Sequence, residues 1–350
     1  MWRGPGEGDS REVHSRGCIL RLEELKLAIV GATGLVGRKI LDVMAERGIL
    51  PRELILTASA RSAGGAVRFG GKDYVVETVE GCIKRKPNVA VFCAGGQVSR
   101  EWAPKFVEAG ALVIDKSSAW RSDPDCPLVV PQVNPVALES IPKGIVASPN
   151  CSTAGFVIAL KPLIERFGEP RHIFVATYQS VSGAGAGGNE ALIRQRNGED
   201  FEGIFPQKIF DNVIPVIGAI DANGFNIEET KLADETRKIL AMPNLHITAT
   251  AVRVPIIACH SEAVTIEFAS DASADEAERV LECAPGLRLM KSPEFPTPLS
   301  AVDFDDVLVG RIRNTPGDRS VLSMFICFDN LRRGAATNAV DLIEHLARKI

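Results

Sequence analysis

The sequence predicts an α/β protein built around two different sheets. In the first half, short apolar runs alternate with helical patterns, which is typical of a mostly parallel, doubly wound sheet. In the second half, strand-like runs follow one another with few helices between them, which predicts a mostly antiparallel sheet. A length of 350 residues suits two domains.

Composition and charge limit the class of protein. Hydrophobic residues make up 45% and charged residues 24% of the chain, which is ordinary for a soluble enzyme. The net charge of −4 and the lack of a Lys/Arg cluster argue against a nucleic-acid-binding surface. No apolar run approaches the length of about 20 residues that a membrane span needs.

The eight cysteines are scattered, and no two of them form a C-x-x-C pair. With no secretory segment in view, this indicates reduced thiols in the cytoplasm and gives no reason to expect a metal site. Residues 1–24 are rich in Gly, Arg and Glu and lack the apolar region of a signal peptide. We expect them to be a disordered extension outside the fold.

The first strand and the first helix frame a glycine-rich turn. A buried strand over residues 26–30 runs into Gly-Ala-Thr-Gly-Leu-Val-Gly at residues 31–37, which opens a helix. Glycines in this position let a pyrophosphate approach the helix N-terminus. The alternative is a glycine-rich turn without a ligand, but the context favours a dinucleotide-binding domain.

The second strand, over residues 54–58, predicts which dinucleotide is bound. NAD enzymes usually carry an acidic residue after this strand to hold the ribose hydroxyls. Residues 59–65 contain no acid, and instead offer Arg61 between two serines. A guanidinium and hydroxyls suit a 2′-phosphate, so we expect NADP. An exposed loop arginine is the alternative.

The rest of the first half completes the alternating pattern. A strand over residues 89–93 ends in a glycine turn at 94–96 that would face the cofactor crevice. A helix over 99–109 and a strand over 111–115 follow. The polar residues 116–121 end in an arginine at the carboxyl end of that strand, which suits an anion site, although a solvated loop is equally plausible.

Cys151 lies at the start of a helix. The strand-like residues 144–147 stop at Pro149, and Cys151 then opens an apolar segment over 156–163. Free backbone N–H groups and the helix dipole at this position favour a thiolate. A small buried core cysteine is the alternative, weakened because polar residues flank Cys151.

The second half contains the strands of the second sheet. After a strand over 172–179, small residues fill 180–188 and suggest close backbone approach or a mobile loop, and 189–224 look loop-rich. The further elements expected are strands over 247–254, 263–269, 307–312 and 320–328, and helices over 226–240, 273–283 and 335–347. We expect Ser273 and Glu276 to form a capping box, and the last helix to dock onto the first domain.

Two further features of the second half are ambiguous by pattern alone. Glu228, Lys231 and Glu235 share one face of the helix over 226–240, which is usually a solvated face. His260 is the one histidine that we place in a turn between strands, a few residues after Arg253. A lone histidine is more often structural.

If Cys151 and His260 converge beside a nicotinamide, the range of possible reactions becomes small. A thiolate attacks an aldehyde or acyl carbon, hydride passes to or from the nicotinamide, and phosphate or water cleaves the thioester. The histidine would take the thiol proton and return it. Arginines would hold a carboxylate and a phosphate.

Segments from about residue 26 to the end of the chain carry a joint resemblance. They are GATGLVG (31–37), SARSAG (59–64), AGG (94–96), SSAWR with PLVVPQVNP (117–135), SPNCST (148–153), TYQSVSGAGA (177–186), EETKLADETRKI (228–239), RVPIIACHSEAV (253–264), VGRIRN (309–314) and DNLRRGAATNAV (329–340). Together, and in this order, they resemble the aspartate-β-semialdehyde dehydrogenase family.

The resemblance implies roles for the reacting and substrate-binding residues. Cys151 would be the acyl-thioester nucleophile and His260 its acid/base. Arg253 would bind the substrate α-carboxylate, Gln179 would orient the substrate, and Glu228 would meet the substrate amino group.

The resemblance also implies which residues bind phosphate and the cofactor. Arg121 and Lys231 would bind phosphate. The implied roles of Glu228 and Lys231 revise the solvated-face interpretation that spacing alone favours for these two residues. The NADP site would be lined by Gly31, Thr33, Gly34, Leu35, Val36, Arg61, Ser62, Ser182, Gly183 and Asn330.

The implied fold is a Rossmann-like NADP-binding domain plus an α+β catalytic and dimerisation domain of the glyceraldehyde-3-phosphate-dehydrogenase-like type. The first would comprise residues 25–150 and 330–350, and the second residues 151–329. The implied reaction reduces aspartyl β-phosphate to the semialdehyde with NADPH and releases phosphate. It would serve lysine, threonine and methionine biosynthesis, in a cytoplasmic homodimer.

Two residues depart from the family pattern. Cys259 stands where many members have glycine, and Lys116 replaces the commoner asparagine. N-acetylglutamyl-phosphate reductase is the nearest rival, and the segments QSVSGAG and EETK favour the aspartyl enzyme. A Cys/His acyl hydrolase is a rival of another class, but the nucleotide-binding loops argue against it, because a hydrolase needs no nicotinamide. The presence of Cys151, His260, Arg253 and Gln179 together argues against a non-catalytic homologue.

Overall fold

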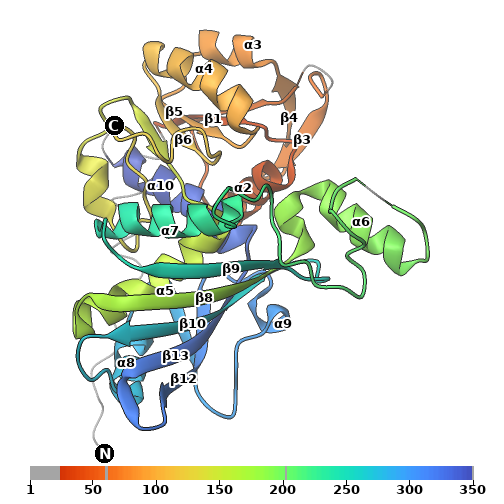
Figure 1. The fold of residues 1–350 in the computed structure, drawn as a ribbon. Helices are drawn as coiled ribbons and strands as arrows, with labels where there is room; N and C mark the ends of the chain where they lie inside the picture. The colour runs from red at the N-terminus through yellow and green to blue at the C-terminus, as the bar shows by residue number, and fades with distance from the viewer. Residues whose placement is uncertain (1–23, 60–61, 202, 349–350) are drawn as a thin grey trace, which may run out of the picture.

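A computed structural model describes residues 24–59, 62–201 and 203–348 (Figure 1). The first sheet and its helices form one body, and the second sheet lies below it, with helices α5 and α7 between them (Figure 1). The predicted α/β class is therefore confirmed, and the second sheet is mostly antiparallel as expected, although two of its strand pairs are parallel. The extension expected over residues 1–24 lies outside the described residues except for Glu24.

The first sheet has the strand order β3-β4-β2-β1-β5-β6-β7, and all neighbours are parallel except β3 and β4. Its strands are β1 (Lys26–Val30), β2 (Glu53–Thr57), β3 (Ala66–Phe69), β4 (Lys72–Glu77), β5 (Val89–Phe92), β6 (Leu112–Asp115) and β7 (Ile145–Ala147). The chain order reverses at β1, so a ligand crevice forms beyond the carboxyl ends of β1 and β5.

Three helices lie between the strands of the first sheet along the chain, and one of them was not predicted. They are α2 (Leu35–Glu46), α3 (Val79–Lys84) and α4 (Gly96–Glu108). The hairpin β3–β4 and helix α3 are absent from the sequence-based prediction. The hairpin turn contains Gly70 and Gly71, both with positive φ, which is the local signal that identifies it in retrospect.

The second sheet has the order β11-β12-β13-β10-β8-β9. Its strands are β8 (Pro170–Gln179), β9 (Ile247–Arg253), β10 (His260–Phe268), β11 (Leu287–Met290), β12 (Val307–Thr315) and β13 (Asp318–Phe328). The pairs β12–β13, β13–β10 and β10–β8 are antiparallel, whereas β11–β12 and β8–β9 are parallel. His260 is the first residue of β10, so its predicted place in a turn was wrong.

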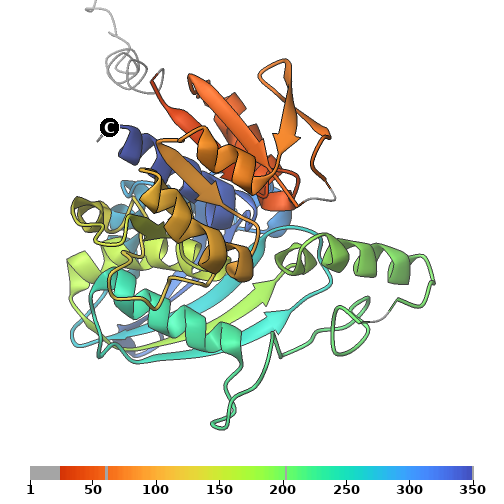
Figure 2. The same ribbon diagram turned by 90° about the horizontal axis from the view of Figure 1, so that it is seen from above.

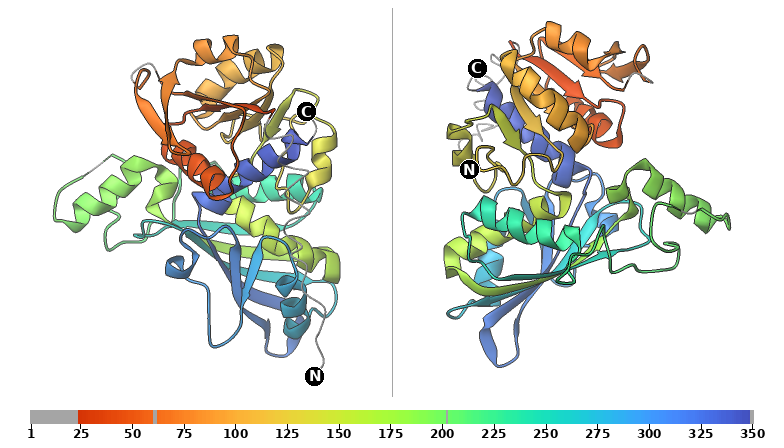
Figure 3. Two further views of the ribbon diagram at one scale, coloured as in Figure 1. Left: turned by 180° about the vertical axis from the view of Figure 1, so that it is seen from behind. Right: turned by 45° about the horizontal axis from the view of Figure 1, so that its top comes forward.

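Helices α5 (Cys151–Phe167), α7 (Ile227–Leu240) and α8 (Ala274–Glu282) contribute to one hydrophobic core with the second sheet. The views in Figure 3 show α5 and α7 on the side of the sheet that faces the first body. Ser273 caps α8 by accepting the N–H of Glu276, but the reciprocal bond of a capping box is not formed there; Asn226 and Glu229 of α7 do form a capping box. No helix in the described part of the chain is long and apolar enough to cross a membrane.

Helix α6 (Ala186–Arg196) occupies part of the segment that was predicted to be loop-rich. Figure 2 shows it projecting from the side of the molecule. A Cβ at Gly188 would lie 2.2 Å from the Val181 carbonyl oxygen, so the glycine allows α6 to approach the preceding η2 turn (Val181–Ala184) closely. Gly188 thus serves close backbone packing.

The last helix returns to the first sheet. Helix α10 (Thr337–Ala347) follows the short π-helix η3 (Arg332–Ala336), and its apolar residues join a core that also contains β1 and α2. At this junction Arg332 binds Glu46 of α2, and it also donates from Nε to Asp305 at 2.9 Å. The predicted docking of the closing helix is therefore confirmed.

Gly155 in α5 provides a stability prediction. A Cβ at this position would lie 2.4 Å from ring atoms of the buried Phe328, so Gly155→Ala forces the ring out of place. We expect the free energy of unfolding to fall by about 1–3 kcal/mol in urea titrations. Gly81→Ala in α3 is the matched control, because its Cβ would meet no atom closer than 3.4 Å. Equal stability of the two variants would contradict this account.

Candidate active site

Three neighbouring strands present a row of polar side chains at one end of the second sheet. His260 of β10 pairs with Gln179 of β8, and Gln179 pairs with Arg253 of β9. Directly opposite residues on adjacent strands project from the same face. All three side chains are buried. Polar side chains are seldom buried unless they have a hydrogen-bonding partner or a function. The register therefore gathers residues that are far apart in the sequence.

Cys151 meets this row from the helix layer. It is the first residue of α5, and Asn150 caps the helix by accepting the Ser152 N–H at 2.9 Å. Its Sγ lies 3.3 Å from Nε2 of His260. The structure thus brings the predicted nucleophile and the predicted acid/base into contact.

The hydrogen bonds of His260 define its tautomer. The backbone N–H of Ser180 donates to Nδ1 at 3.1 Å, and a backbone N–H can only donate. Nδ1 is therefore unprotonated, and the neutral ring carries its proton on Nε2, directed at Cys151 Sγ. In this resting arrangement the imidazole donates to the sulfur. Sequence reasoning expected it to receive the thiol proton first.

Burial favours the neutral forms of both partners. It raises the pKa of the Cys151 thiol to about 11, assisted by Glu228 and opposed by Arg253 and Arg121. Burial, assisted by the Arg253 cation, lowers the pKa of His260 to about 3. Burial therefore opposes the thiolate that the free N–H groups at the start of α5 favour.

Helix α7 forms another side of the site through buried charges. Glu235 accepts the Asn150 backbone N–H at 2.6 Å and pairs with Arg121 at 3.0 Å. Glu228 accepts from the Asn150 side chain at 2.8 Å and lies 3.7 Å from Lys231 Nζ. Contact with the start of α5 buries both carboxylates, so the solvated-face interpretation, which still stood for Glu235, was wrong.

A cavity of about 280 Å³ opens beside the thiol. It is lined by residues of both bodies: Leu35, Val36, Cys93, Gly95, Lys116, Ser117, Arg121, Pro149, Asn150, Cys151, Ser182, Gly183, Gly185, Asn330, Leu331, Gly334 and Ala335. Leu35, Val36, Ser182, Gly183 and Asn330, all predicted to bind the cofactor, thus share one cavity with Cys151. Lys231 lines a neighbouring cavity of about 500 Å³ instead, and Arg121 lines both.

The glycine turn fits a dinucleotide. Gly31 has φ +97°, and a Cβ there would lie 2.9 Å from the Cys93 backbone. Gly34 is the N-cap of α2 and offers no capping side chain, so the first N–H groups of the helix lack that partner. Thr33 lies in the same turn. Such a cradle suits a pyrophosphate.

The residues predicted to select NADP are only partly described. Arg61 lies outside the described residues. Ser62 lies in the turn after β2, half-buried.

Ser180 and Asn150 were not predicted as parts of the site. Ser180 orients His260, and its side chain also donates to Asn330 Oδ1 at 3.1 Å. Asn330 accepts in addition the backbone N–H of Cys259, which has φ +72°. The local signal for Asn150 was an asparagine before a helix, whereas nothing local identifies Ser180.

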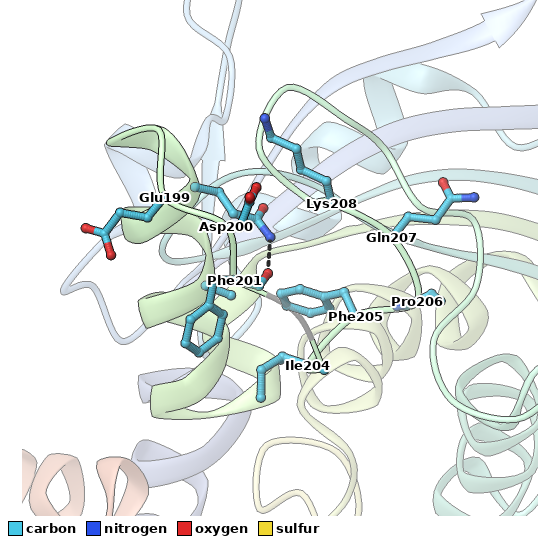
Figure 4. Close-up of a pocket in the computed structure, with 11 residues that line it drawn as sticks. Glu199, Asp200, Phe201, Ile204, Phe205, Pro206, Gln207 and Lys208 are labelled. Carbon is cyan, nitrogen blue, oxygen red and sulfur yellow. Dashed lines mark hydrogen bonds between the residues drawn. The ribbon is translucent and has the colours of Figure 1, made fainter.

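A separate cavity of about 380 Å³ lies along the segment after α6 (Figure 4). Gln195 of α6 donates to the Phe201 carbonyl at 2.8 Å and holds part of this segment against the helix. The Phe205 ring lies 5.9 Å from the guanidinium carbon of Arg253. None of the predicted site residues lines this cavity.

No group of three or more His, Cys, Asp or Glu residues in the described part of the chain is arranged to hold a metal ion.

Comparison with known proteins agrees with this arrangement. Residues 26–141 match the family model of the semialdehyde dehydrogenase NAD binding domain, and residues 160–333 match that of the semialdehyde dehydrogenase dimerisation domain. The aspartate-semialdehyde dehydrogenase of Aquifex aeolicus is 45% identical over 336 residues, which cover 93% of this chain and 98% of the relative.

Solved structures give the same result. The crystal structure of aspartate semialdehyde dehydrogenase II from Vibrio cholerae complexed with ASA has a TM-score of 0.90 and 42% identity, covering 93% of this chain and 98% of that chain. The Candida albicans aspartate semialdehyde dehydrogenase with NADP has a TM-score of 0.73 and 26% identity, covering 93% and 99%. With two family models over most of its length and relatives over nearly all of it, the chain belongs to the aspartate-semialdehyde dehydrogenase family.

Proposed function

We propose that this enzyme catalyses the reversible, NADP-dependent reductive dephosphorylation of L-aspartyl 4-phosphate to L-aspartate 4-semialdehyde, through a thioester on Cys151. The reaction would serve lysine (through diaminopimelate), threonine and methionine biosynthesis. The observation that carries this proposal is the contact of 3.3 Å between Cys151 Sγ and His260 Nε2 in a cavity shared with residues of the nucleotide turn. The Vibrio cholerae relative complexed with ASA supports the substrate.

Each substrate-binding residue is assigned to one part of the substrate. Arg253 binds the α-carboxylate, Glu228 the amino group, and Gln179 orients the chain so that the acyl carbon faces Cys151. The thiolate sulfur forms a bond to that carbon, and the carbon–oxygen bond to phosphate breaks with its electron pair on the departing phosphate. Arg121 and Lys231 bind the phosphate.

His260 supplies the proton at Nε2. A bound nicotinamide would contribute a hydride donor or acceptor beside the acyl carbon. The proton of the Cys151 thiol leaves with the departing phosphate, and the Nε2–H stabilises the thiolate as it attacks. The Nε2–H then protonates the oxygen of the tetrahedral intermediate, and His260 regains this proton when the intermediate collapses to the aldehyde. Ser180 keeps this N–H aimed at the sulfur by occupying Nδ1. Burial of the row from Arg253 to His260 limits competing hydrolysis of the thioester.

The cofactor is proposed to be NADP rather than NAD. The absence of an acidic residue in the segment 59–65, and the presence of Arg61 and Ser62 there, support binding of a 2′-phosphate. The Candida albicans structure with NADP supports the same choice. Gly31, Thr33 and Gly34 would accommodate the pyrophosphate.

The proposed assembly is a cytoplasmic homodimer formed through residues 151–329, with residues 25–150 and 330–350 as the nucleotide-binding domain. The match of residues 160–333 to a dimerisation domain supports it. Phe174 and Tyr178 of β8 are 44% and 37% exposed, and they provide apolar surface on this sheet for a second copy. The described cysteines are all free, which is compatible with a reducing compartment.

Formation of NADPH from aspartate semialdehyde, NADP and phosphate tests the function. We expect turnover to require phosphate and to be faster with NADP than with NAD. N-acetylglutamate semialdehyde is the control substrate. Turnover with that control alone would keep the chemistry and overturn the substrate, and a folded protein that binds NADPH but turns over neither substrate would overturn the activity.

A further inference from the structure

The cations around Cys151 differ in how their charges are compensated. Arg121 pairs with Glu235 at 3.0 Å, and Lys231 lies 3.7 Å from Glu228. Lys116 has no carboxylate of the described residues within ion-pair distance, and the same is true of Arg253. The site thus contains two cations without an ion-pair partner among the described residues. One of them, Arg253, already has a proposed anionic partner in the substrate α-carboxylate.

Lys116 is held at the wall of the thiol cavity. It directly follows β6, and its Nζ donates to Ser148 Oγ at 2.5 Å. Ser148 follows β7, three positions before Cys151, and its Oγ also accepts from Asn338 at 2.7 Å. An ammonium group has three N–H donors, and this contact uses one of them. Lys116 and Cys151 both line the cavity of about 280 Å³, so the remaining donors are available to a ligand there.

Arg121, in contrast, has most of its donors engaged by the protein. Nε donates to the Ser148 carbonyl at 2.9 Å, Nη1 to Glu235 at 3.0 Å, and Nη2 to the Lys116 carbonyl at 2.9 Å. Two of these bonds fix the backbone of Lys116 and of its acceptor Ser148. The guanidinium therefore positions the lysine as well as contributing charge.

The substrate has two anionic ends, and the reacting carbon is attached to the phosphate. With its carboxylate on Arg253 and its acyl carbon at Cys151, the phosphate needs a cation on the cavity wall beside the thiol. We propose that Lys116 is a phosphate-binding residue of this enzyme, donating hydrogen bonds to the departing phosphate in reduction and to the attacking phosphate in oxidation. This inference rests on the proposed function. Lys116 makes and breaks no covalent bond, because the electron pair of the broken carbon–oxygen bond leaves on the phosphate.

The electrostatic surroundings of Lys116 suit an anionic ligand. Burial, assisted by the Arg121 cation, lowers the pKa of Lys116 to about 7, and Cys151, Asp115 and Cys93 oppose this effect. The Asp115 carboxylate is engaged by Ser117, through its N–H at 3.0 Å and its hydroxyl at 2.7 Å. A bound phosphate dianion would supply the missing countercharge.

The test compares Lys116→Met, Lys116→Arg and the control Lys105→Met, an exposed lysine of α4. We expect Lys116→Met to raise the KM for phosphate about 10- to 100-fold, the usual effect of losing a charged hydrogen bond. The KM values for the semialdehyde and for NADP should stay within about twofold, on the same scale of effects. Lys116→Arg should restore most of the phosphate affinity, and Lys105→Met should match the wild type.

Two further readouts separate this role from others. Phosphate should protect Cys151 from iodoacetamide in the wild type and in Lys116→Arg, but not in Lys116→Met. Above about pH 7, phosphate affinity should fall more steeply in the wild type than in Lys116→Arg, because only the lysine loses its proton there.

Other results would overturn the inference. A change in the NADP KM with an unchanged phosphate KM would assign Lys116 to the cofactor. Slower alkylation of Cys151 in Lys116→Met without phosphate, again with an unchanged phosphate KM, would assign it to the thiolate. A wild-type enzyme that needs no phosphate would overturn the proposed function itself.

Discussion

Replacing Cys151 by serine should reduce turnover by at least about 10⁴-fold, as expected for loss of a covalent nucleophile. The change removes the thiol but keeps the size of the side chain and the start of α5, so folding and NADPH binding should persist. Release of NADPH from the semialdehyde, NADP and phosphate measures the effect. Cys283→Ser, at an exposed cysteine after α8, is the matched control and should retain full activity.

A trapping experiment identifies the covalent step directly. Without phosphate, the wild type mixed with the semialdehyde and NADP should accumulate an acylated Cys151, detectable as a mass increase on the peptide that contains it. Cys151→Ser should show no adduct. If the serine variant formed NADPH in a first turnover as fast as the wild type, a thioester on Cys151 could not be part of the reaction.

Replacing His260 by alanine should lower kcat/KM about 10²- to 10⁴-fold, the usual contribution of a positioned acid/base. His260→Gln makes the test more specific, because an amide can donate a hydrogen bond to the sulfur but cannot transfer a proton. We expect the glutamine variant to regain part of the Cys151 alkylation rate without regaining turnover. If glutamine restored turnover as well, hydrogen bonding alone would explain the role of His260.

The same residue should make the protein sensitive to acid. The pKa of His260 is lowered from its ordinary value of 6.5 to about 3, so the unfolded chain binds a proton that the folded protein excludes. The contribution of neutral His260 to the free energy of unfolding is fully present above about pH 6.5. It falls as the pH drops toward 3, by about 1.4 kcal/mol per pH unit.

This effect is measured as a difference between variants. Between pH 7 and pH 5, the wild type should lose about 2 kcal/mol more unfolding free energy in urea than His260→Gln. His246→Gln, at an exposed histidine, is the control and should behave as the wild type does. Parallel pH profiles for the wild type and His260→Gln would show that His260 is not held neutral.

Local signals were enough to locate some parts of the site. A glycine turn between strand and helix and a polar helix start with a cysteine depend on residues that are adjacent in the chain, so the sequence reveals them. Gly31 and Cys151 were found in this way.

Other features depended on contacts between distant segments. His260 was assigned to a turn because the cross-strand register that places it beside Gln179 is not encoded nearby. Glu235 was assigned to a solvated face because its partners, Arg121 and Asn150, lie about a hundred residues earlier, as the separations of 114 and 85 show. The pKa of Cys151 depends on burial, which the helix position alone does not reveal.

The return of α10 to the first sheet has a consequence for how the protein is made. Val340, Ile343 and Leu346 share one core with β1 and α2, from the opposite end of the sequence. On the ribosome, that core stays incomplete until the residues of α10 have been synthesised, whereas every described strand of the second sheet has been synthesised by Phe328. The second sheet therefore has the chance to assemble first during synthesis, and the core beneath the nucleotide-binding crevice is completed only after α10 has left the ribosome.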